Sequence, residues 1–139
     1  MKLYLSSVLT ALFLFFAPVK GIILIVALST IIDTCFGVWK AVKLGEDVTS
    51  KIFRKGLLSK LLTYVAATML IFASDVFIIN ELTRSLVSVD FISTKILSLV
   101  LVAIEVKSMD ESFIKVNGYS FIDRAKSIII KIKNIKGQL

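Results

Sequence analysis

Two long apolar stretches constrain this fold more than any other feature of the sequence. Residues 21–42 and 57–79 each carry only two charged side chains, and about 20 mostly apolar residues are enough for a helix to cross the hydrocarbon core of a bilayer. The 139-residue chain is 57% hydrophobic, with a mean hydropathy of +0.91, which exceeds the apolar share of ordinary soluble domains. We therefore predict an all-α integral membrane protein.

Two further stretches are shorter or more charged. Residues 88–109 include Asp90, Lys95 and Glu105, and they can still span if Lys95 extends to the outer surface. Residues 3–17 are uncharged but short, and Pro18 breaks or kinks the chain after them. That first stretch can span, lie re-entrant, or be a signal peptide, although Phe15 stands where signal cleavage favours a small residue. We predict three to four transmembrane helices within residues 1–112, followed by a basic tail, 113–139.

The basic residues orient these helices, because Lys and Arg are retained on the cytoplasmic side of a membrane. If all four stretches span, every Lys and Arg except Lys20, Arg84 and Lys95 lies on one side, and both termini are cytoplasmic. If residues 3–17 do not span, only the N-terminus changes sides. The charged segment 43–56, with Gly45 and Gly56 at its ends, is expected to be a solvated cytoplasmic connector.

A net charge of +7 in so apolar a chain favours anionic lipid headgroups as the partner. Nucleic acid is disfavoured, because the basic residues lie between apolar spans and form no patch with stacking aromatics. In the tail, Ile122, Ala125, Ile129 and Ile132 follow helical spacing, but residues 128–135 also alternate like a strand, and a tail ordered only by the membrane surface is a third reading. The candidate surface residues are Lys51, Arg54, Lys55, Lys126, Lys131, Lys133 and Lys136.

The sequence offers little material for catalysis. It has no histidine and a single cysteine, Cys35, so histidine-dependent acid–base chemistry, a Cys/His metal site and an internal disulfide are excluded. We expect neither enzymatic activity nor a cofactor.

Polar residues inside the apolar stretches are the candidate functional residues, because an ionisable group at mid-membrane is costly and normally faces protein or water. Asp33 lies near the bilayer middle, and Gly37 and Lys40 share its helix face, where Gly37 would permit close approach of another backbone. Glu105 is expected to pair with Lys40 or Lys60 near the cytoplasmic end.

Helix-packing patterns point to self-association. One side of helix 57–79 is a stripe of mostly small residues and the other side is polar, so that helix requires two non-lipid neighbours. A heptad-like polar seam also runs along the last span. The stripe comprises Ser59, Thr63, Ala66, Leu70, Ala73 and Ser74. The opposite side comprises Tyr64, Thr68 and Asp75. The polar seam comprises Thr94, Ser98, Leu101, Glu105, Ser108 and Ser112.

Over residues 32–118 the chain resembles the phage-lysis and toxin-secretion holins, the family that includes clostridial toxin-release holins. An acidic, glycine and lysine element followed by a basic loop carries most of the resemblance, and a later acidic–serine–acidic element adds to it. The matching residues are Asp33, Gly37, Lys40, Ala41, Ser50, Gly56, Lys60, Asp75, Glu105, Ser108, Glu111 and Gly118. The chain departs from the family in its additional apolar N-terminal stretch and in Asp110-Glu111-Ser112, where an acidic–Asn pair is usual.

The resemblance implies a homo-oligomer that accumulates in the bacterial cytoplasmic membrane and forms lesions that release an endolysin or another cargo. Two alternatives stay open. One is a small proton-coupled multidrug-type transporter with Asp33 or Glu105 as its proton-binding carboxylate, although residues 3–17 lack the acidic residue that such a first helix needs. The other is a holin antagonist or a passive phage membrane protein, which would share every feature described above.

Overall fold

The computed structural model describes residues 2–83 and 88–136, without the side chains of residues 2–3, 50–52 and 134–136. Helices and short connectors make up these residues and none of them forms a strand, which confirms the all-α prediction. The elements are α1 (Lys2–Phe16), the 3₁₀ turn η1 (Ala17–Val19), α2 (Lys20–Leu44), α3 (Ser50–Ser74), the π-helical turn η2 (Asp75–Ile79), α4 (Asn80–Thr83), α5 (Ile92–Asn117) and α6 (Phe121–Lys136).

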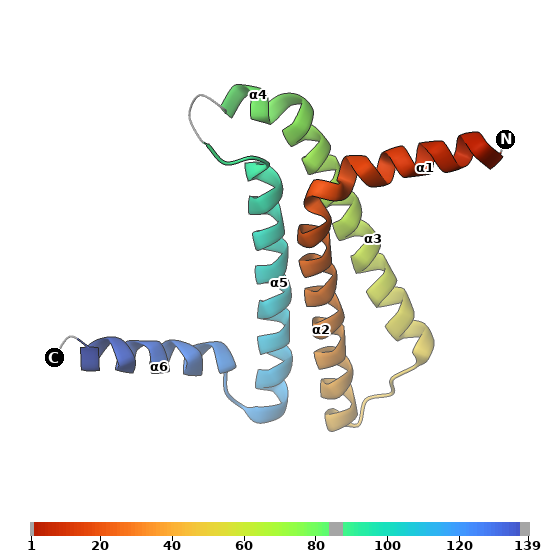
Figure 1. Ribbon diagram of the computed structural model, residues 1–139. Coiled ribbons are helices and arrows are strands. Elements are labelled where there is room, and N and C mark those ends of the chain that lie inside the picture. The colour runs from red at the N-terminus through yellow and green to blue at the C-terminus, as the bar shows by residue number, and fades with distance from the viewer. Residues whose placement is uncertain (1, 84–87, 137–139) are drawn as a thin grey trace.

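Helices α2, α3 and α5 form a bundle in which α2 packs against both of the others and α3 also contacts α5. Figure 1 shows α1 and α6 leaving this bundle at opposite ends, α1 where α2 begins and α6 where α5 ends. The end of the bundle from which α6 leaves also carries the connector between α2 and α3. The bundle thus has two distinct ends, each marked by one projecting helix.

The distribution of polar residues in this bundle is inverted relative to a soluble protein. Large apolar side chains such as Leu24, Leu62 and Leu99 are exposed around its outside, while more polar than apolar residues are buried among the described residues. Two helical segments, Tyr4–Leu44 and Phe53–Thr83, are long and apolar enough to cross a membrane. An apolar exterior over a hydrogen-bonded polar interior is the arrangement expected in lipid.

The predicted break at Pro18 is present. Proline has no backbone N–H to continue the ladder, and the chain passes through η1 before α2 begins. Phe15 and Phe16 remain against the bundle, with ring centroids 5.3 and 5.7 Å from that of Phe72, while most of α1 projects away (Figure 1). Residues 3–17 are therefore helical, and their relation to the membrane stays a prediction.

The connector between the first two bundle helices is shorter than predicted. Gly45 does end α2, in the left-handed conformation with φ 73°, but α3 starts at Ser50, so Gly56 lies inside a helix and its expected turn role is wrong. Arg54 and Lys55 are good helix formers, and the charged segment adds turns to α3. The unstructured part is reduced to residues 46–49.

Helix α5 is shifted relative to the predicted span 88–109. It begins at Ile92, after Phe91 in a left-handed conformation with φ 55°, and ends before Gly118 with φ 76°. The predicted division at residue 112 thus falls within a continuous helix. Residues 121–136 are helical, so the strand alternative for the tail is wrong and the helical spacing is confirmed.

Candidate functional site

Three bundle helices meet at a buried ionic cluster formed by Asp33, Lys60 and Glu105. The Lys60 Nζ on α3 donates to Asp33 Oδ2 on α2 at 2.7 Å, and to Glu105 Oε2 and Oε1 on α5 at 3.0 and 3.3 Å. The expected pairing of Glu105 with Lys60 is therefore present. The alternative partner, Lys40, makes no ion pair with any described acidic group.

Burial makes this cluster a strong constraint on the bundle. The Glu105 side chain is 0% exposed and that of Asp33 8%, whereas the Lys60 side chain keeps 39%. The Tyr64 hydroxyl, one helical turn after Lys60, donates to Glu105 Oε1 at 2.8 Å. A buried carboxylate is tolerated when it is paired and its remaining lone pairs are hydrogen-bonded, and Glu105 meets both conditions.

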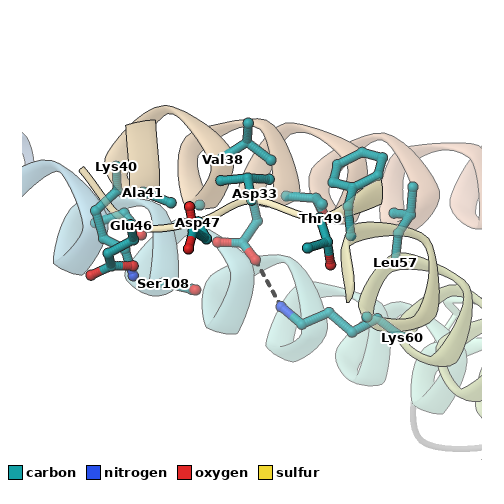
Figure 2. Close-up of a pocket in the computed structure, with 16 residues that line it drawn as sticks. Asp33, Val38, Lys40, Ala41, Glu46, Asp47, Thr49, Leu57, Lys60 and Ser108 are labelled. Atoms are coloured by element: carbon teal, nitrogen blue, oxygen red, sulfur yellow. Dashed lines mark hydrogen bonds and ion pairs between the residues drawn. The ribbon is translucent and has the colours of Figure 1, made fainter. Parts of the chain in front are cut away.

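A cavity of about 390 Å³ opens beside the cluster. Figure 2 shows Asp33 and Lys60 pointing towards each other along it. Its walls include Gly37, Lys40, Ala41, Ser108 and Ser112, and residues 46–49 of the connector complete it. The cluster contains one more acidic group than ammonium groups. The space beside it is lined by hydroxyl groups, by a second lysine, Lys40, and by two further acidic residues, Glu46 and Asp47.

A second buried carboxyl group joins η2, the turn that follows α3, to the beginning of α5. Asp75, the first residue of the π-helical turn η2, is fully buried, and its Oδ2 accepts hydrogen bonds from the Thr94 backbone N–H at 2.7 Å and from the Thr94 hydroxyl. It thereby caps the amino-terminal end of α5, where a negative charge is favoured. Its Oδ1 has no hydrogen-bond partner in the described part of the chain.

The structure brings some predicted site residues together and separates others. Asp33, Asp75 and Glu105 are buried, and Gly37, Lys40, Ala41 and Ser108 lie half-buried around the cavity. Ser59 and Thr63 are exposed on the outer face of α3, and Glu111 is exposed near Lys107, with 3.9 Å between Oε1 and Nζ. A Cβ added at Gly37 would meet nothing within 4 Å, so the close helix approach expected there does not occur within the protomer.

The candidate surface residues lie as follows. Arg54, Lys55, Lys126, Lys131 and Lys133 are exposed, and Lys126 Nζ lies 3.4 Å from Asp123 Oδ1. Lys51 and Lys136 fall outside the described side chains. No group of three or more His, Cys, Asp or Glu within residues 2–83 and 88–136 is arranged to hold a metal ion.

Sequence reasoning missed the structural role of Asp110. This residue is 8% exposed, and its Oδ1 accepts hydrogen bonds from the backbone N–H groups of Phe121 and Ile122 at 2.8 and 3.3 Å, while Oδ2 accepts one from the Ser120 hydroxyl at 2.7 Å. Ser120 in turn accepts from the Asp123 N–H at 3.0 Å. The sequence signal was Gly118 followed by Ser120, a helix stop followed by an N-cap.

The comparison with known proteins identifies a family. The sequence profile of the bacteriophage holin family matches residues 10–110, which contain the ionic cluster and the Asp75–Thr94 contact. No curated protein and no solved structure matches the chain.

Proposed function

The chain belongs to the bacteriophage holin family, and we propose that it acts as a holin, a membrane protein that self-associates and permeabilises the bacterial cytoplasmic membrane. The family is not a family of enzymes. In this function the released cargo is an endolysin or a similar protein that reaches the cell wall through the lesion.

The observation that carries the proposal is the uncovered outer face of α3. Ser59, Thr63 and Ala66 are exposed there, whereas Tyr64 and Thr68, on the other side of the same helix, face the bundle. The Thr63 hydroxyl donates to the Ser59 carbonyl at 2.8 Å, so its hydrogen-bonding capacity is met within the helix. A helix face made of small residues lets helices of two protomers approach closely in lipid.

The buried clusters give each protomer the rigidity that such assembly requires. Lys60 ties α3 to the middle of α2 and of α5, and Asp75 ties η2 to the beginning of α5. The outer face of α3 is consequently presented in a fixed orientation. In this proposal protomers pack through that face as they accumulate, and a lesion opens when many protomers have assembled.

The distribution of basic residues supports one orientation of the bundle in the membrane. The basic residues Arg54 and Lys55 of α3 and those of α6 belong to the same end of the bundle (Figure 1), and the retention of basic residues in the cytoplasm would place that end inside the cell. In this orientation α2, α3 and α5 all cross the membrane and the C-terminus is cytoplasmic.

Controlled expression in bacteria tests the function. We expect membrane potential, followed with a voltage-sensitive dye, to collapse abruptly after a delay, and we expect co-expressed cytoplasmic endolysin to lyse the cells at that moment. Ala66→Leu adds bulk to the exposed face of α3 and should delay the collapse severalfold. Ala103→Leu makes the same change at an exposed position of α5 and should leave the timing unaltered.

Two results would contradict the proposal. One is a monomer, by cross-linking in membranes, whose high expression leaves the potential intact. The other is equal timing for Ala66→Leu and Ala103→Leu, which would remove the role of the α3 face. Proton-driven uptake of a solute by sealed proteoliposomes would favour the transporter alternative instead.

A further inference from the structure

Helix α6 is an exposed amphipathic helix that points away from the bundle. Residues 123–133 are exposed throughout, and Figure 1 shows α6 running out from the end of α5. Ile128, Ile129 and Ile132 keep 58, 64 and 59% of their surface exposed. Isoleucine side chains that stay this exposed to the described part of the protomer require an apolar environment from elsewhere.

The order of residues along α6 defines what that environment is. At 3.6 residues per turn, Ala125, Ile128, Ile129 and Ile132 share one face. Arg124 and Lys131 border this face on one side, and Lys126 and Lys133 border it on the other side. Basic side chains on both margins of an apolar face are typical of a helix that lies flat in a membrane interface, with its cations among the headgroups.

Aromatic contacts connect the beginning of α6 to α5 and α2. Trp39 of α2 stacks on Phe113 of α5 with centroids 5.9 Å apart, and Phe113 contacts Tyr119 and Phe121 at 5.4 and 5.6 Å. The Arg124 guanidinium lies 3.9 Å from the centre of the Tyr119 ring. Trp and Tyr concentrate at the level of the headgroups, so this aromatic cluster marks the depth from which α6 departs.

We propose that α6 is a surface-binding helix for anionic phospholipid, with its isoleucine face in the acyl boundary and its marginal Arg and Lys side chains on the headgroups. Asp110 fixes the direction in which α6 leaves α5, because its two oxygens hold Ser120, Phe121 and Ile122. The proposal rests on the membrane residence of the proposed function and is independent of lesion formation.

Site-specific fluorescence on the full chain in vesicles tests this. In a Cys35→Ser background, which removes the one native cysteine, single cysteines are introduced as Ile129→Cys or Ser127→Cys and labelled with an environment-sensitive dye. In vesicles of equal parts phosphatidylglycerol and phosphatidylcholine, we expect the label at 129 to be quenched by spin-labelled acyl chains. The label at 127 should be quenched by aqueous iodide.

Charge variants measure the contribution of the headgroups. A basic residue near an anionic surface raises the equilibrium constant for membrane binding by about fivefold. Lys131→Gln together with Lys133→Gln should therefore lower this constant for α6 by about 25-fold. Lys43→Gln together with Lys55→Gln removes the same charge at exposed positions outside α6 and should leave the quenching at 129 unchanged.

Two outcomes would overturn the proposal, and a third would separate it from the proposed function. Equal iodide quenching at 127 and 129 would place α6 in water. The label at 129 could also stay protected from iodide in vesicles of pure phosphatidylcholine. If two unlabelled Ile129→Cys chains then also formed a disulfide, the partner of α6 would be a second copy of the chain. Lipid quenching at 129 without dye release from the vesicles would uphold the inference while the proposed lesion fails.

Discussion

The Nζ of Lys60 lies 2.7 Å from Oδ2 of Asp33 and 3.0 Å from Oε2 of Glu105, so one ammonium group pairs with carboxyl groups from two different helices. Removing it would leave two acidic groups close together in a low-dielectric interior. The bundle therefore depends on Lys60 more than on either carboxylate alone, because no other described lysine pairs with them.

Lys60→Met should destabilise the protein by about 3 kcal/mol, the lower part of the range for a broken buried pair, since the Lys60 side chain is partly exposed. Unfolding in mixed micelles titrated with SDS measures this. Lys55→Met, an exposed position on the same helix, is the control and should change stability little. Adding Asp33→Asn and Glu105→Gln to Lys60→Met should recover most of the loss, and a triple variant as unstable as Lys60→Met would contradict the ionic explanation.

Tyr64→Phe should cost about 1 to 2 kcal/mol, because Glu105 Oε1 loses a hydrogen-bond donor in a buried site. The same unfolding titration is the measurement. Tyr119→Phe removes a hydroxyl from an exposed tyrosine whose ring stays available to Arg124, and it should be neutral. If the two variants were equally stable, the Tyr64–Glu105 hydrogen bond would contribute nothing.

Periodicity along single helices predicted much of this arrangement. The burial of Asp33 and of the polar seam from Thr94 to Ser112 could be predicted, because a polar residue in an apolar span normally faces protein. The sequence could not predict that Glu105 pairs with Lys60 and not with Lys40, because this depends on how α2 and α3 are rotated relative to α5. Pro18 likewise predicts a break in the chain, but the direction of α1 follows from the packing of Phe15 and Phe16 on Phe72.

Helix caps supplied by residues that are distant along the chain could not be predicted from the sequence, for a related reason. Asp75 and Asp110 each sit on one helix and cap the beginning of another element, whereas sequence rules for caps cover only residues next to the helix they stabilise. Gly37 shows the opposite failure. Its lack of a side chain suggested close packing, yet the space beside it is open in the protomer.

Asp75→Ala should destabilise the protein by about 1 to 2 kcal/mol, because the amino-terminal end of α5 loses its buried cap. A double-mutant cycle with Thr94→Val separates the shared interaction from the individual losses. The matched control is Asp90→Ala, which removes an exposed carboxylate just before α5. Strictly additive effects of Asp75→Ala and Thr94→Val would show that the two side chains are not coupled.

Asp110→Ala should release the direction of α6 while leaving the bundle folded, because its contacts with Ser120, Phe121 and Ile122 set the start of that helix. Spin labels on α5 and on the far part of α6, measured by double electron–electron resonance in detergent, should give a narrow distance distribution in the parent protein and a broad one in the variant. Asp123→Ala removes an exposed carboxylate from the same helix start and should keep the distribution narrow. The aromatic contacts of Phe113 with Tyr119 and Phe121 remain in both variants, so an unchanged distribution in Asp110→Ala would assign the direction of α6 to those rings in place of the carboxylate.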